Sequence, residues 1–337
     1  MYSTLEQAPP DTSPEPIIEL SGIPGVTEVA LAERSMSLDN SQGSVNVKVV
    51  AVTHDLLGID PHSDHVAAIG KRTHLGVAVE SQDGSKRTFV QSVAGPLWFR
   101  TKKPNEPQLD RERTALRRTG ARAADIGRRA LRHSGLIAPS PNAEPAEGEL
   151  YETTAPGVGL LNAIWAVQTA YTAGRLSENE AANIFTSMYD AATSSLTAFH
   201  NTKLIHGHAH LRNFIIDPAT GNVQLIDYTL AVKKNLILNW ARRNTVGADE
   251  WNAAQDRARF KREWKEQIEK IGLSPTTSHL SMEERKVAAA QLERAVALDA
   301  LHKVTGVYPS EGEIDRFIDI QHDLISDAPT VTYPQAA

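Results

Sequence analysis

The stretch Leu204–Ala231, LIHGHAHLRNFIIDPATGNVQLIDYTLA, constrains the fold of this chain more than any other part of the sequence. Two short apolar runs, 214–216 and 223–226, flank a segment rich in turn-forming residues. This pattern predicts an antiparallel β-hairpin. Pairing across the turn would bring Asn213, at the start of the first strand, close to Asp227, at the end of the second. An amide oxygen and a carboxylate that converge suit Mg²⁺, which takes few protein oxygens and completes its shell with water or phosphate.

The remainder of the chain divides into a strand-rich part and a helical part. Alternating apolar residues predict strands within 18–155, and Asp83-Gly84 is typical of a tight hairpin turn. From Leu160 onward the apolar residues repeat at helical spacing. Three Ser-x-x-Glu capping boxes mark helix starts, at Ser177/Glu180, Ser281/Glu284 and Ser310/Glu313. The helices expected after the hairpin span about 248–271, 281–304 and 311–326.

Composition excludes several classes of protein. The chain has 337 residues, a net charge of −6 and no cysteine, which argues against a dedicated nucleic-acid binder and against a disulfide framework. No apolar run reaches the ~18 residues of a membrane span. The N-terminus lacks the features of a secretory signal, so a cytoplasmic location is expected. Residues 1–17 resemble a disordered tail, which leaves a secreted effector open. Nothing in the sequence fixes the oligomeric state.

The motif HGHAHLRNFIID…VQLIDYTLA resembles the catalytic segment of the protein-kinase-like superfamily, and is most similar to its aminoglycoside-phosphotransferase and choline-kinase branch. The resemblance implies an α+β, bilobal fold. Its strand-rich N-lobe would comprise residues 18–155 and cover the nucleotide. Its mainly helical C-lobe would comprise residues 156–330, with the catalytic loop and hairpin at 204–231.

The resemblance also implies roles for individual residues. Asn213 and Asp227 would bind Mg²⁺ and, through it, ATP. His206 matches a structural histidine of the family, and His210 matches a second histidine that either supports the loop or contacts phosphate. His208 falls where the family has its catalytic aspartate, so this chain departs from the pattern at one position. A neutral imidazole can still accept a proton near neutral pH.

In the first lobe, the resemblance assigns two more residues. Lys102 would be the nucleotide-binding lysine, with Arg100 and Lys103 as competitors. Glu112 would be its partner on a helix. That helix would belong to the Arg-rich segment 109–133, whose exposed side chains are expected to be solvated or, alternatively, to bind an anion or a partner. No glycine-rich phosphate loop is evident.

The function expected from this resemblance is Mg-ATP-dependent phosphoryl transfer to a hydroxyl of a small molecule or a protein, with His208 in place of the usual aspartate. A kinase-like nucleotidyl (AMP) transferase and a nucleotide-binding pseudokinase stay open. So does a docking module without catalysis.

A rival hypothesis from another class is a zinc or iron hydrolase. Alternate residues of an extended strand share one face, so His206, His208 and His210 would ligate the metal together with Asp227.

Overall fold

The structure, a computed structural model, describes residues 26–41, 43–56, 73–93, 96–101, 149–153, 157–226, 231–233, 253–273 and 280–327. The predicted tail 1–17 and the Arg-rich segment 109–133 lie outside these ranges. Lys102, Glu112 and Asp227 also lie outside the described residues, so the roles assigned to them stay predictions.

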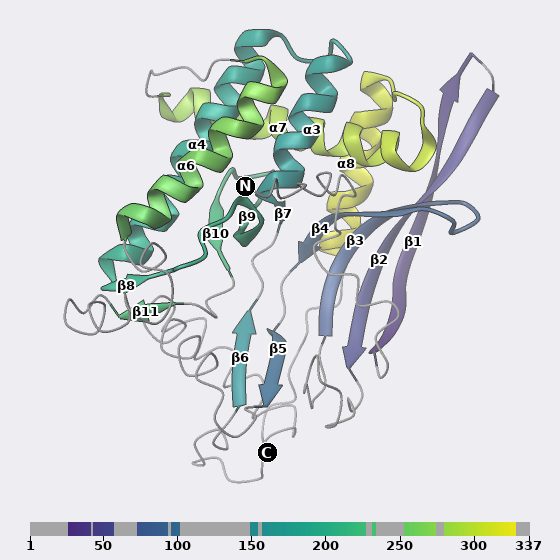
Figure 1. The fold of residues 1–337 in the computed structure, drawn as a ribbon. Helices are drawn as coiled ribbons and strands as arrows, with labels where there is room; N and C mark the ends of the chain where they lie inside the picture. Colours follow the sequence, from purple (N-terminus) through teal and green to yellow (C-terminus); the bar gives the residue numbers. More distant parts are fainter. Residues whose placement is uncertain are drawn as a thin grey trace, which may run out of the picture.

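The N-terminal part is an antiparallel sheet in which successive strands are neighbours (Figure 1). Its strands are β1 (Val26–Asn40), β2 (Gly43–Leu56), β3 (Thr73–Ser81) and β4 (Arg87–Val93). The predicted Asp83-Gly84 turn joins β3 to β4, and Gly84 adopts a φ of 71° there. A separate antiparallel pair is formed by β5 (Pro96–Thr101) and β6 (Glu149–Thr153). The strand-rich character expected of this part is confirmed.

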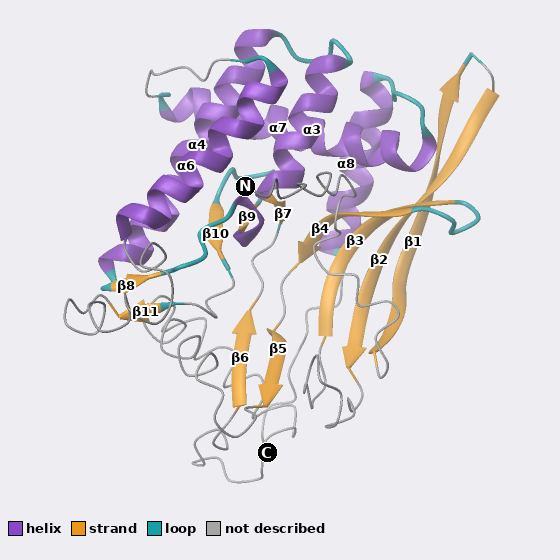
Figure 2. Ribbon diagram, viewed as in Figure 1, coloured by secondary structure: helices purple, strands orange, loops and turns teal. Residues whose placement is uncertain are grey.

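The C-terminal part is mainly helical (Figure 2). Each predicted capping box is present, because the Ser side chain accepts the N3 backbone N–H while the Glu side chain accepts the N-cap backbone N–H. The chain is therefore an α+β protein with an N-terminal sheet, as predicted. No helix in the described ranges is long and apolar enough to cross a bilayer. The helices are α3 (Leu160–Thr172), α4 (Glu178–Asn201), α6 (Ala253–Ile271), α7 (Met282–Thr305) and α8 (Glu311–Ser326).

The last helix returns to the first sheet. In Figure 1, α8 lies against the sheet, and its contacts are with β1, β2 and β3. Leu38 and Val49 of the sheet belong to the same buried cluster as Phe317 of α8. Polar contacts fix this packing at two points along the helix, since Glu313 Oε1 accepts the backbone N–H of Asp39 at 2.6 Å and Gln321 donates to Gln91 at 2.6 Å. The division into lobes at residue 155 stays a prediction.

Candidate active site

The predicted β-hairpin is present and sets the register of the site. β9 (Phe214–Ile216) pairs with β10 (Val223–Leu225), with Phe214 opposite Leu225. One step beyond this pair, Ile226 donates its backbone N–H to the Asn213 carbonyl at 2.8 Å. Asn213 therefore lies opposite the residue that precedes Asp227 in the sequence.

A glycine lets the preceding strand approach this hairpin. β7 (Val158–Gly159) pairs with β9 and extends the sheet on its other side. Just before it, Gly157 has a φ of 130°, and a Cβ atom there would lie 2.0 Å from the Ile216 carbonyl oxygen. Any side chain at this position would push the strand off the hairpin.

The three histidines lie on a loop and not on an extended strand. β8 (Leu204–Ile205) pairs with β11 (Val232–Lys233) and ends before His206. Gly207 follows with a φ of 77°, in the left-handed region that glycine adopts without strain. A short 3-10 helix, Leu211–Asn213, then leads into β9. The assumption that the three histidines lie on one extended strand is therefore wrong.

His206 is completely buried and uses both ring nitrogens inside the protein. Nε2 donates to the Ile226 carbonyl at 2.9 Å, and Nδ1 accepts the backbone N–H of His208 at 3.2 Å. The ring also packs edge-on against Phe199 of α4, with centroids 5.5 Å apart. With both nitrogens engaged, His206 has no lone pair to offer a metal.

The bonding of His206 removes the basis of the zinc or iron hydrolase hypothesis, which required three histidine ligands from this loop. Within the described ranges, no group of three or more His, Asp or Glu side chains is arranged to hold a metal ion.

Helix α6 holds the loop by a buried carboxylate. Asp256, which is 3% exposed, accepts the backbone N–H of His206 through Oδ2 at 2.8 Å and that of Gly207 through Oδ1 at 2.9 Å. It also contacts Nε2 of His200, at the end of α4, at 2.9 Å. One turn further along α6, Arg259 donates to the Gly207 carbonyl at 3.0 Å. The backbone of the loop is thus tied to α6, and Asp256 in turn links α6 to α4.

A second carboxylate of α6 binds the other end of the loop. One carboxylate oxygen of Glu263 accepts a hydrogen bond from Nδ1 of His210. The other accepts the backbone N–H of Leu211 at 3.0 Å. Burial raises the pKa of Glu263, but these bonds, together with the charge of His210 when it is protonated and the charge of Arg259, outweigh burial and lower the pKa below its ordinary value. Glu263 is therefore ionised at neutral pH.

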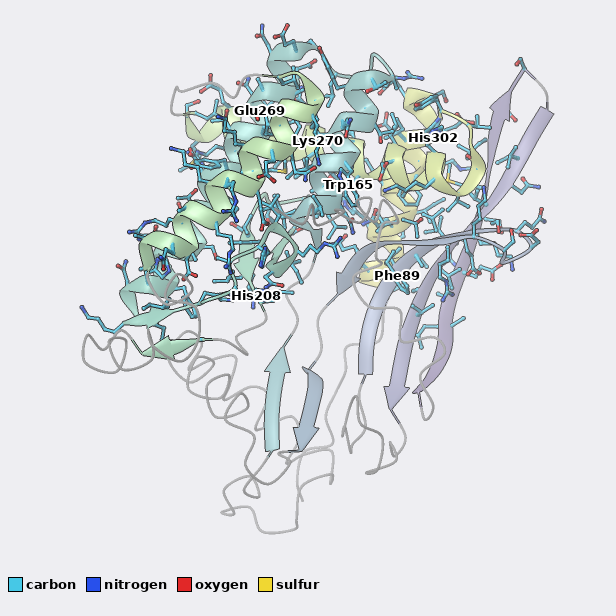
Figure 3. The ribbon with its side chains drawn as sticks, viewed as in Figure 1. Phe89, Trp165, His208, Glu269, Lys270 and His302 are labelled. Carbon is cyan, nitrogen blue, oxygen red and sulfur yellow. The ribbon has the colours of Figure 1, made fainter. Side chains whose placement is uncertain are left out.

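The loop and the hairpin place His208, His210 and Asn213 together. The Asn213 amide nitrogen donates to the His208 carbonyl at 2.7 Å and lies 3.3 Å from the His208 Nδ1 atom. The rings of His208 and His210 meet edge to face, with centroids 4.3 Å apart. Figure 3 shows His208 toward the N-terminal end of α6, with Glu269 and Lys270 at the far end of that helix.

Two functional candidates, Asp256 and Glu263, were missed in the sequence. The predicted helix 248–271 was recognised, but not that its acids contact the loop. A signal did exist: the buried stripe of α6 is Asp256, Phe260, Trp264 and Ile268, with an acid at a position where helical spacing demands an apolar residue. A carboxylate in a core stripe needs buried donors, and the loop supplies them.

Comparisons with known proteins add little. No family model matches the chain, and no curated protein matches its sequence. Among solved structures, the chain is similar to a kinase domain of a rhoptry antigen from Toxoplasma gondii, with 13% identity over 88% of both chains and a TM-score of 0.32. A score this low carries no weight for fold or function.

Proposed function

We propose that this chain is a kinase-like protein that binds a Mg-nucleotide and transfers its γ-phosphoryl group to a hydroxyl. The proposal combines the sequence motif around His206 and Asn213 with the geometry of the hairpin. It does not depend on the overall likeness to any solved structure.

The observation that carries the proposal is the position of Ile226. Its backbone N–H is bound by the Asn213 carbonyl, and its own carbonyl is bound by the His206 ring. Ile226, which directly precedes Asp227 in the sequence, is therefore fixed by both the loop and the first strand. In the motif the asparagine and the aspartate bind the same metal ion. The pairing of Ile226 with Asn213 favours that arrangement.

The bonding of Asn213 fits a hard cation. Its amide nitrogen donates a hydrogen bond to the His208 carbonyl, while its Oδ1 accepts no hydrogen bond from the described residues. An amide oxygen held in this way is a ligand that Mg²⁺ accepts. Asn213 and Asp227 would hold the ion, and when bound the ion would neutralise charge on the nucleotide phosphates.

The remaining parts of the proposed site come from the sequence resemblance alone. Lys102, with Glu112 as its partner, would bind the phosphates from the N-terminal part of the chain. The acceptor would be a small molecule or a protein, and the protein would act in the cytoplasm.

The test is nucleotide binding by the full chain. ATP with Mg²⁺ should raise the melting temperature, because a ligand that binds only the folded state stabilises it. Asn213→Ala and Asp227→Ala should each abolish that shift. Gln224→Ala, which removes an exposed amide from the same hairpin, is the matched control and should keep it. A wild-type protein without any shift would refute the proposal.

The histidine at the position of the usual catalytic aspartate favours two further candidates, a nucleotidyl transferase and a pseudokinase. ATP labelled on both the γ-phosphate and the adenine separates them from a phosphotransferase. Transfer of the γ label alone supports the proposed reaction, and transfer of the adenine label indicates nucleotidyl transfer. Binding without transfer of either label indicates a pseudokinase.

A further inference from the structure

The two histidines that meet in the site have opposite hydrogen-bond environments at Nδ1. In His210, Nδ1 faces the carboxylate of Glu263. In His208, Nδ1 faces the amide nitrogen of Asn213. A neutral imidazole carries one proton, and the partner of one nitrogen decides which nitrogen holds it. The two rings are therefore set to different tautomers.

For His210 the assignment follows from Glu263. An ionised carboxylate is an acceptor only, so Nδ1 of His210 must donate and hold the ring proton. In the neutral ring the lone pair is then on Nε2. The His210 side chain is 34% exposed, so the lone pair of this ring is not sealed in the core. A carboxylate on Nδ1 and a lone pair on Nε2 are the arrangement of a base oriented by an acid.

For His208 the assignment follows from Asn213. The amide group of Asn213 has one orientation only, because the His208 carbonyl it binds at 2.7 Å needs a donor. The nitrogen that makes this bond also faces Nδ1, at 3.3 Å. Nδ1 of His208 therefore accepts, and its proton lies on Nε2. In this tautomer His208 donates a hydrogen bond from Nε2 and has no second lone pair with which to take up a proton.

We propose that His210, oriented by Glu263, is the base that takes the proton of the attacking hydroxyl, and that His208 acts as a hydrogen-bond donor beside it. This inference depends on the proposed phosphoryl transfer. In that step the hydroxyl O–H bond breaks and its proton goes to Nε2 of His210. The hydroxyl oxygen forms a bond to the γ-phosphorus, and the bond to the β-phosphate oxygen breaks, with its electron pair leaving on the diphosphate. Glu263 is a positioning residue that acts through His210.

Nitrogen NMR of the full chain labelled with ¹⁵N-histidine tests the tautomers without any substrate. The expected result is a protonated Nδ1 for His210 and a protonated Nε2 for His208. His210→Gln and His208→Gln variants assign the two rings among the 12 histidines. The same tautomer in both rings, or the two assignments reversed, would overturn the proposal.

Glu263→Gln gives a sharper version of this test. The Leu211 N–H needs an acceptor, so the Gln oxygen would turn to Leu211 and its NH₂ group would face His210. The His210 proton should then move to Nε2, while the ring stays in place. Glu269→Gln is the matched control, since it removes an exposed acid from the far end of the same helix and should change neither tautomer.

Turnover is tested with Mg-ATP and water as the acceptor, following release of inorganic phosphate. His210→Ala should lower kcat on the order of 10²–10⁴-fold, as expected for loss of a general base, with KM for Mg-ATP unchanged. Added imidazole should restore part of the rate in His210→Ala and none in Glu263→Gln, where the cavity is filled.

The failures of the two proposals are distinguishable. If the melting temperature of the wild-type protein does not respond to Mg-ATP, both the proposed function and the assignment of His210 as the base are refuted. A wild-type protein that binds Mg-ATP and releases phosphate, while His210→Ala keeps its full rate, refutes the base alone. Binding of Mg-ATP without release of phosphate also counts against His210 as the base, because water, like the proposed acceptor, has an O–H bond from which the base would take a proton.

Discussion

Asp256 accepts the backbone N–H of His206 at 2.8 Å, although 50 residues separate them in the sequence. The same carboxylate accepts the next backbone N–H, from Gly207. Two successive amides that point at one buried anion leave the loop few other conformations. This contact makes α6 the support on which the His208 and His210 side chains are presented.

Asp256→Ala should therefore destabilise the protein strongly. It removes a buried anion and leaves two backbone N–H groups and His200 without their acceptor, which typically costs about 3–5 kcal/mol. Urea unfolding followed by circular dichroism measures the change. Asp319→Ala, an exposed aspartate on α8, is the control and should change the free energy of unfolding by less than about 0.5 kcal/mol. Equal effects of the two variants on the free energy of unfolding would contradict the role of Asp256 in holding the loop.

Substitution of Gly157 should also lower the free energy of unfolding strongly. Gly157→Ala places a Cβ atom 2.0 Å from the Ile216 carbonyl oxygen in a backbone with a φ of 130°. Backbone strain and overpacking together should cost at least about 3 kcal/mol. Gly174→Ala is the matched control, because its φ is 69° but nothing lies within 4 Å of the added atom. That variant should cost only about 1–2 kcal/mol, and thermal unfolding compares the two.

The features predicted correctly from the sequence depend on residues close together in the chain, whereas the contacts that were missed join distant segments. The hairpin and the capping boxes depend on residues a few positions apart, so spacing alone located them. The contacts of Asp256 and Glu263 with the loop join segments about 50 residues apart, and helical periodicity carries no information on which loop a helix side chain meets. The spacing of the histidines was also misleading, because Gly207 turns the chain where an extended strand was assumed.

The capping boxes predict how stability depends on pH. Hydrogen bonds from Ser177 lower the pKa of Glu180, and those from Ser281 lower the pKa of Glu284, below the ordinary value of 4.5. Burial raises the pKa of Glu313, but bonds from Ser310 outweigh it and lower the pKa. A folded pKa below the unfolded value gives a stabilisation that is complete above the unfolded pKa and is lost as pH falls through the folded one.

The free energy of unfolding should therefore fall as the pH drops below 4.5. A triple variant with Gln at positions 180, 284 and 313 keeps the capping geometry but cannot titrate there, so its loss in acid should be smaller. Urea midpoints between about pH 3 and pH 7 give the comparison. Identical acid slopes for both proteins would contradict the role of these carboxylates.

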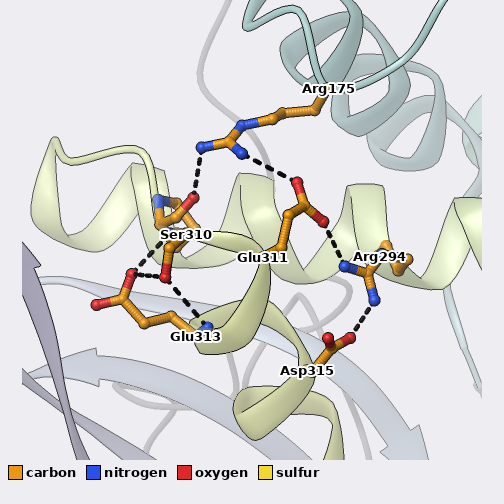
Figure 4. Close-up of polar contacts among 7 residues, drawn as sticks. Arg175, Arg294, Ser310, Glu311, Glu313 and Asp315 are labelled. Atoms are coloured by element: carbon orange, nitrogen blue, oxygen red, sulfur yellow. Dashed lines mark hydrogen bonds and ion pairs between the residues drawn. The ribbon is translucent and has the colours of Figure 1, made fainter.

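The ion pairs between α7 and α8 predict a small, salt-dependent effect (Figure 4). Arg294 binds Glu311 and Asp315, and Glu311 also binds Arg175 at 3.0 Å. All of these side chains are about a third or more exposed, so water screens the pairs. Arg294→Gln should cost no more than about 1 kcal/mol, and the cost should shrink as NaCl is raised. Arg316→Gln, an exposed arginine on α8, is the control and should show no such dependence on salt. A large cost for Arg294→Gln that does not change with salt would mean that this network stabilises the helix pair by packing and not by charge.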